Sequence, residues 1–213
     1  MLQWLYNIKN GWYYLFLIVM SAVFVYLSNY FLTEILVYNV LGEQFTALQI
    51  QQLLGEMTKW QPLGYLLISL IVIIRPLFTA FCLLTGSLFQ EYHWKWKNIF
   101  NISLKADIVF LFSQMCNFYY YVFVKDAGTL QDVNTNCLSL LNFTNKESVP
   151  AWLVSAYNSA NLFEVLYIAL LTVFIVKIFK LKWFKSLVFV LLTYGIGTYL
   201  YIAAMTFLYL NYM

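Results

Sequence analysis

The chain has 213 residues, of which 63% are hydrophobic, 21% aromatic and 10% charged, and its formal net charge is +3. Soluble domains carry about a quarter charged residues, so this composition excludes a water-soluble domain and predicts an integral membrane protein. A few scattered lysines against a membrane also argue against nucleic acid as a partner.

The first apolar run covers residues 12–32. It is long enough to cross a bilayer, which takes about 20 residues of helix. The end of the run reads VYLSN, without the small-residue pattern of a signal-peptide cleavage site. We therefore expect a retained signal anchor.

A short amphipathic helix is predicted after this span. Ile50, Leu53, Leu54 and Met57 recur at the spacing of one helix face, and the sequence TALQ at residues 46–49 is typical of a capping box. Such a helix would lie flat at the membrane surface. An ordinary loop covering the bundle would explain the same pattern.

The second span, residues 63–89, contains the only arginine of the chain, Arg75, followed by Pro76. At about 1.5 Å rise per residue, Arg75 lies near the middle of the bilayer, where a charge costs roughly 3 kcal/mol or more. A neutralising partner or a water-filled cavity is therefore expected. Pro76 cannot donate a backbone hydrogen bond to Val72, which predicts a helix kink.

Three further spans are predicted at residues 106–124, 160–178 and 186–210. A polar, asparagine-rich segment at 126–148 separates the first two of these. It is followed by a second amphipathic pattern, in which Val149, Trp152, Leu153 and Ala156 share a helix face and Pro150 suits a first turn. The sequence thus predicts an all-α polytopic membrane protein: one membrane domain, residues 1–213, with five transmembrane helices and two short amphipathic interfacial helices.

The distribution of lysines sets the expected orientation. With the N-terminus inside, the cytoplasmic segments hold eight lysines and the outer segments three, as the positive-inside rule requires. The inner set is Lys9, Lys95, Lys97, Lys105, Lys177, Lys180, Lys182 and Lys185, and the outer set is Lys59, Lys125 and Lys146. Acidic residues lean outward, at Glu34, Glu43, Glu56, Asp126, Asp132 and Glu147. Five spans then place the C-terminus outside.

Glu164 is the predicted partner of Arg75, because it begins the fourth span from the same outer side. Asp107 begins the predicted third span from the inside, which places it too far along the membrane normal unless that span is displaced. The candidate buried polar cluster consists of Arg75, Glu164, Gln114, Asn117, Asn161 and Tyr167. Such a cluster either fixes helix register or lines a substrate or ion pathway. A closed ion pair would favour the first role and a water-accessible cavity the second.

The patterns of common catalytic sites are missing. His93, the sole histidine, stands in a basic loop, and the sequence has no H-E-x-x-H motif and no glycine-rich phosphate loop. Cys82, Cys116 and Cys137 lack the paired spacing of a disulfide or metal site. We therefore expect no catalytic residue, no metal and no cofactor, with an intramembrane enzyme of unrecognised type as a third possibility.

The segment NLFEVLYIALLTVFIVKIFKLKWFKSLVFVLLTYGIGTYL, residues 161–200, joins an N-L-F-E entry to one span with a short basic turn and a Y-G-x-G element in the next. In these features it resembles bacterial members of the Yip1 superfamily, and the likeness extends to residues 63–124. The resemblance implies a five-span helical domain with an accessory or transport-related role, and it transfers no catalytic residue.

These observations predict a non-enzymatic accessory or scaffold protein of a bacterial inner membrane. Its expected partners are the lipid bilayer and either another membrane protein or a second copy of itself. The bacterial source rests on eleven lysines against one arginine, a composition typical of an AT-rich genome. The alternative is a transporter or channel component with a polar site around Arg75 and Glu164.

Overall fold

The computed structural model describes residues 6, 8–33, 37–39, 42, 45–124, 135–144 and 149–212. Within these ranges the chain forms helices and connections, with one isolated antiparallel bridge between Ser139 and Asn161. In the part of the chain that the structure describes, five helical stretches are long and apolar enough to cross a membrane. They are Asn10–Asn39, Ala47–Phe89, Trp96–Val124, Leu162–Phe179 and Trp183–Asn211. The all-helical, multi-pass architecture agrees with the composition.

The first two spans are longer than the sequence predicts. Helix α2 (Asn10–Ser28) continues into η1, a π-helical turn (Asn29–Thr33). Helix α4 (Ala47–Phe89) has 43 residues, about 65 Å at 1.5 Å per residue, which is roughly twice the thickness of the hydrocarbon core. The amphipathic helix predicted near Ile50 is therefore not separate. Its residues form the first turns of α4, because residues 58–61, three of which are polar, are also helical and Pro62 does not end the helix.

The predicted capping box and the predicted kink both belong to α4. The capping box is at the start of the helix, and Pro76 lies inside it. The side chain of Gln49 accepts a hydrogen bond from the Thr46 backbone N–H at 2.9 Å, which stabilises the start of the helix. Pro76 is buried inside the helix, which continues through it to Phe89. The kink at Pro76 stays a prediction.

The third span begins ten residues before its predicted start. It consists of α5 (Trp96–Ala106), α6 (Ile108–Tyr119) and η2, a π-helical turn (Tyr120–Val124), with a break at Asp107. Its polar first half resembles a loop in the sequence. Ile99, Ile102 and Ala106 nevertheless form a buried apolar stripe on α5, so this half is an amphipathic helix facing the core.

Lys105, which the sequence places in a cytoplasmic loop, is completely buried in α5. Its ammonium group donates a hydrogen bond to the Ile8 carbonyl at 3.0 Å and lies 3.9 Å from the centroid of the Tyr13 ring. The Tyr13 hydroxyl in turn donates to the Lys105 carbonyl at 3.0 Å. Lys105 thus joins α5 to the start of α2. It lies in a buried helix and not in a loop because the third span begins at Trp96, earlier than predicted.

The last part of the chain forms α8 (Leu140–Phe143), α9 (Ala151–Ser159), α10 (Leu162–Phe179), α11 (Trp183–Val190), the π-helical turn η4 (Leu191–Gly195) and α12 (Ile196–Tyr212). Helix α9 begins directly after Pro150 and corresponds to the second predicted amphipathic helix. It packs against α12. A position of α9 at the membrane surface stays a prediction.

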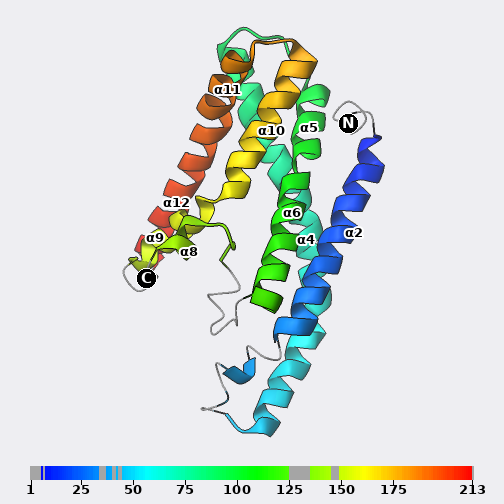
Figure 1. Ribbon diagram of the computed structural model, residues 1–213, viewed down its shortest axis with the longest axis vertical. Helices are drawn as coiled ribbons and strands as arrows, with labels where there is room; N and C mark the ends of the chain where they lie inside the picture. Colours follow the sequence, from blue (N-terminus) through cyan, green and yellow to red (C-terminus); the bar gives the residue numbers. More distant parts are fainter. Residues whose placement is uncertain are drawn as a thin grey trace.

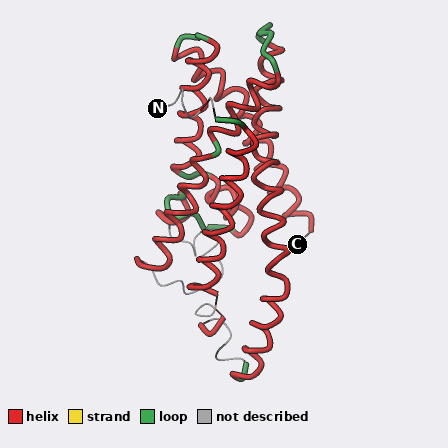
Figure 2. Tube along the Cα trace, turned by 90° about the vertical axis from the view of Figure 1, so that its right-hand side faces the viewer, coloured by secondary structure: helices red, strands yellow, loops and turns green. Residues whose placement is uncertain are grey.

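The helices form an elongated bundle with the third span near its centre (Figure 1). Half of the most apolar stretch of the third span is buried, whereas only 17% of the corresponding stretch is buried in the first and last spans. The third span contacts α2, α4 and α10. Figure 2 shows the same bundle from the side. We call the end that holds the start of α2 and the α10–α11 connection the N-terminal end, and the end that holds residues 135–144 and α9 the cap end.

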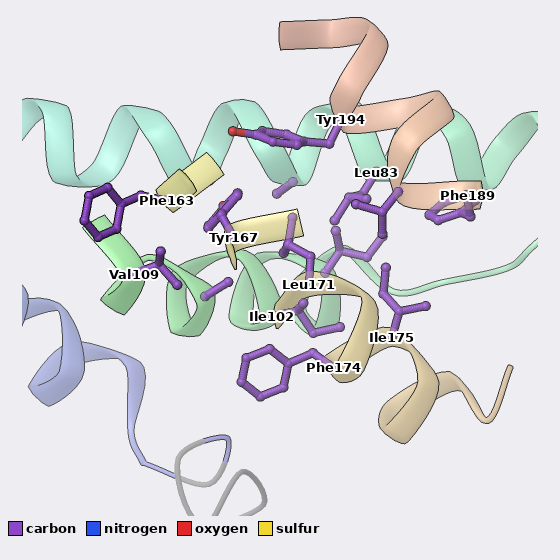
Figure 3. Packing of buried hydrophobic residues seen from close by; sticks show 14 of the residues in the cluster. Leu83, Ile102, Val109, Phe163, Tyr167, Leu171, Phe174, Ile175, Phe189 and Tyr194 are labelled. Carbon is purple, nitrogen blue, oxygen red and sulfur yellow. The ribbon is translucent and has the colours of Figure 1, made fainter. Parts of the chain in front are cut away.

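Large side chains of α10 fill the middle of the bundle (Figure 3). Tyr167, Leu171 and Ile175 are completely buried there and meet Leu83 of α4. Glycines let α4 and the last span approach closely, because a β-carbon on Gly86 would overlap the Thr193 side chain and one on Gly197 would lie 2.5 Å from the Cys82 sulfur. The core thus holds the polar residues of α4, α6 and α10 at fixed positions.

Candidate functional site

Arg75 of α4 forms an ion pair with Asp107, which occupies the break between α5 and α6. The Nη1 atom of Arg75 lies 3.7 Å from Oδ2 of Asp107, and the two side chains are 31% and 3% exposed. The Arg75 guanidinium also lies 3.9 Å from the centroid of the Phe110 ring, one turn further along α6. The arginine is therefore held by a carboxylate and an aromatic face, both from the third span.

This ion pair corrects the predicted pairing of Arg75 with Glu164. Arg75 lies 14 residues before the end of α4 and Asp107 lies 11 residues after the start of α5. At 1.5 Å per residue these distances are about 21 Å and about 17 Å, so the two residues lie at similar depth in antiparallel helices. The prediction failed because it started the third span at residue 106 and so placed Asp107 at the membrane surface.

Glu164 of α10 instead accepts a hydrogen bond from Tyr194. The Tyr194 hydroxyl lies 2.9 Å from Oε2 of Glu164, and Tyr194 belongs to η4, whose π-helical turn changes the direction of the side chains along the last span. The neighbouring Tyr167 donates to the hydroxyl of Thr79 on α4 at 2.9 Å. These two hydrogen bonds connect α10 to the helices on either side.

A polar cavity of about 250 Å³ lies beside Arg75. Its wall comes from α4, α6, α10 and the cap end, and all of its lining residues except Phe110 are polar. They are Arg75, Phe110, Ser113, Gln114, Asn117, Asn136, Asn158, Ser159, Asn161 and Glu164. We refer to this space as the polar cavity. It carries one positive and one negative side chain together with five amides, so it can hold water or a small polar molecule.

Asparagine side chains close the polar cavity at the cap end. Asn117 of α6 donates to Oδ1 of Asn136 at 2.9 Å and accepts from the backbone N–H of Cys137 at 2.8 Å. Asn158 accepts from the backbone N–H of Asn136 at 2.8 Å. Residues 135–144 are thereby attached to α6 and to the end of α9. We call these residues the cap.

Asn161 positions the carboxylate of the site. It is the N-cap residue of α10, and its Oδ1 atom accepts from the backbone N–H of Glu164 at 2.9 Å. Its amide nitrogen donates to the carbonyls of Asn158 and Ser159. Asn161 therefore fixes the first turn of α10, on which Glu164 lies, relative to the cap end.

Cys137 of the cap lies outside the five spans and is buried. Burial raises the pKa of the Cys137 thiol above its ordinary value. Less of the thiol is therefore ionised at neutral pH, and because the thiolate is the reactive form, Cys137 should react slowly with alkylating reagents. The three cysteines are free in the structure.

Five of the six residues of the predicted cluster line the polar cavity: Arg75, Glu164, Gln114, Asn117 and Asn161. The sixth, Tyr167, is buried between α4 and α10 and has its own partner in Thr79. The sequence reasoning placed Asp107 at the wrong depth, and it missed the contributions of Asn136 and Tyr194. The buried stripe on α5 could have revealed the depth of Asp107, and the density of asparagines in residues 134–161 was a signal for Asn136.

No protein family, curated protein or solved structure matches this chain. The resemblance of residues 161–200 to the Yip1 superfamily stays a prediction.

Proposed function

We propose that this chain is a transporter or channel component that admits a small polar solute to the polar cavity. The observation that carries the proposal is the cavity itself, which brings polar walls to Arg75 inside an otherwise apolar bundle. A register-fixing role would be served by a closed ion pair, whereas Arg75 keeps 31% of its side-chain surface exposed. Ionisable groups inside a membrane bundle are costly and usually line a pathway.

Irregular backbone beside the cavity supports the same proposal. The third span is interrupted at Asp107, and the last span has a π-helical turn at Tyr194. At membrane depth such irregularities are tolerated where the backbone is buried in protein or lines a cavity. Solute sites of secondary transporters are typically built where spanning helices are broken.

The size and charge of the polar cavity limit the solute. Pockets for drug-sized ligands measure roughly 300–1,000 Å³, so a cavity of about 250 Å³ suits a smaller molecule. Its wall offers guanidinium, carboxylate and amide groups, which favour a polar solute over a lipid chain. The solute class is therefore a small, hydrogen-bonding molecule.

The lysines that the structure describes support the proposed orientation, with the N-terminus inside a bacterial inner membrane. Lys95, Lys97, Lys180, Lys182 and Lys185 lie at the N-terminal end, whereas Lys59 lies near the opposite end of α4. The positive-inside rule then places the N-terminal end in the cytoplasm. Other charges predicted for the outer side lie outside the described residues, namely Glu34, Glu43, Lys125, Asp126, Asp132, Lys146 and Glu147.

An accessory or scaffold role is the second candidate, and one observation favours it. A groove of about 620 Å³ runs between the end of the first span and the first half of α4. Met57 and Trp60 line this groove and are exposed. A transmembrane helix of another protein, or of a second copy, would cover such a surface.

Solute flux through proteoliposomes distinguishes the two candidates. Liposomes containing the protein should swell faster than empty liposomes in urea, glycerol or glycine. Arg75→Gln should reduce the protein-dependent part of the swelling rate roughly tenfold, which corresponds to a loss of about 1.4 kcal/mol of solute binding. Lys59→Gln, which removes an exposed charge on the same helix, should leave the rate unchanged. Flux equal to that of empty liposomes with all three solutes would contradict the transport proposal and leave the accessory role.

A further inference from the structure

Arg75 brings unused hydrogen-bond donors to the polar cavity. A guanidinium group carries five N–H donors, and among the described residues none of them donates a hydrogen bond to a protein acceptor. The closest approach to Asp107, at 3.7 Å, is an ion pair that is too long for a hydrogen bond. Arg75 lines the cavity and is 31% exposed. Its donors are therefore available to an anionic group inside the cavity.

Glu164 brings unused acceptors to the same cavity. Its Oε2 atom accepts from the Tyr194 hydroxyl at 2.9 Å, whereas Oε1 has no hydrogen-bond donor among the described residues. Within those residues Arg75 pairs with Asp107, and no ion pair joins it to Glu164. The side-chain oxygen of Gln114, in the same wall, is buried without a donor. These oxygens suit a group rich in N–H donors.

The asparagines of the wall have less capacity to spare. Asn117 uses both its amide nitrogen and its amide oxygen to hold the cap. Asn161 does the same at the start of α10, where its oxygen accepts from the Glu164 backbone and its nitrogen donates to two carbonyls. These amides hold the wall together, so selection among solutes falls mainly to the two charged side chains.

The two charged side chains ask for a solute with charges of both signs. An anion would satisfy the donors of Arg75 and would also meet the carboxylate of Glu164. A cation would satisfy Glu164 and leave the donors of Arg75 unmet. A buried polar group without a partner costs about 1–3 kcal/mol, and a charged one costs more. A solute with one carboxylate and one ammonium group satisfies both sides and leaves the net charge of the cavity unchanged.

We propose that the polar cavity binds a small zwitterion, with its carboxylate on Arg75 and its ammonium group on Glu164 and Gln114. This proposal rests on the transport function proposed above and names its substrate class. Arginine binds carboxylates through two parallel hydrogen bonds, for which the unused donors of Arg75 suffice. A cavity of about 250 Å³ is smaller than the pockets of drug-sized ligands, so the class is that of the smallest amino acids.

Uptake of labelled glycine into proteoliposomes, with competitors of matched size, tests the assignment. Unlabelled alanine carries both charges and should compete with glycine. Glycolate lacks the ammonium group and glycinamide lacks the carboxylate, so each leaves one charged side chain without its partner. Both should compete at least about tenfold more weakly than alanine. Competition by glycolate or glycinamide as strong as that by alanine would overturn the zwitterion assignment.

Glu164→Gln tests the ammonium site separately. The amide keeps an oxygen for the Tyr194 hydroxyl and removes the negative charge. The variant should lower glycine uptake about tenfold more than it lowers glycerol permeation. Glu56→Gln removes an exposed carboxylate outside the polar cavity and should not change the ratio of the two rates. Equal losses of glycine and glycerol flux in Glu164→Gln would refute the role of Glu164 in binding the ammonium group.

The zwitterion assignment and the transport proposal fail in different ways. Protein-dependent flux of urea or glycerol without saturable glycine uptake would refute the zwitterion and leave transport in place. Absence of flux with every solute would refute transport alone, and the melting temperature in detergent would then decide the zwitterion site. A rise with glycine that is larger in the natural chain than in Glu164→Gln supports the site. Equal rises refute it.

Discussion

Replacing Asp107 with leucine is expected to destabilise the protein by about 3 kcal/mol. The substitution leaves Arg75 without its carboxylate inside the bundle, and removing one partner of a buried pair typically costs about 3–5 kcal/mol. We expect the lower end of that range because Arg75 remains 31% exposed and can be hydrated from the polar cavity. The free energy of unfolding of the detergent-purified protein measures the effect.

A double variant separates the ion pair from a general packing effect. Arg75→Met together with Asp107→Leu removes both charges and should recover much of the lost stability, since apolar replacements of buried ion pairs are often neutral. Glu56→Leu, on an exposed part of α4, is a matched control and should change stability by less than about 0.5 kcal/mol. Strictly additive losses in the double variant would show that Arg75 and Asp107 do not interact.

Replacing Asn117 with leucine is expected to detach the cap from α6. Asn117 supplies the amide that binds Oδ1 of Asn136 and the oxygen that accepts the Cys137 backbone N–H. Each buried group left without a partner costs about 1–3 kcal/mol. As the cap opens more often, the Cys137 thiol should be alkylated faster, by roughly tenfold for each 1.4 kcal/mol lost.

The alkylation rate is measured in a chain in which Cys82 and Cys116 are replaced by alanine. Asn101→Leu is the matched control, because Asn101 lies near the N-terminal end and contacts the Tyr6 carbonyl instead of the cap. That control should leave the Cys137 rate unchanged. Equal rates in Asn117→Leu and in the parent chain would show that Asn117 does not hold the cap in place.

Apolar composition and run length were enough to predict five helices long and apolar enough to cross a membrane among the described residues, because a spanning segment needs about 20 apolar residues. The boundaries were harder. Residues 96–105 carry lysines and asparagines, so they resemble a loop until their buried stripe is recognised. The sequence likewise predicts a separate element at the start of α4, since Thr58, Lys59 and Gln61 interrupt the apolar pattern without interrupting the helix.

The cost of a charge in hydrocarbon identified Arg75 as the centre of the site. The same rule could not identify its partner, because the choice between Asp107 and Glu164 depends on where the third span begins. The contribution of Asn136 could not be predicted either. It reaches the cavity because residues 135–144 pack against α6 and the end of α9, a long-range arrangement that local sequence patterns do not determine.

The central claim is that water reaches Arg75 through the polar cavity, and thiol reactivity in liposomes tests it most directly. In a chain whose three native cysteines are alanine, Gln114→Cys introduces a thiol beside the cavity, and Phe112→Cys introduces one on the outward face of the same helix, where Phe112 is 52% exposed. A charged methanethiosulfonate reagent needs a hydrated thiolate. We expect Gln114→Cys to react and Phe112→Cys to remain unreactive. A folded Gln114→Cys protein that is as unreactive as Phe112→Cys would contradict the account.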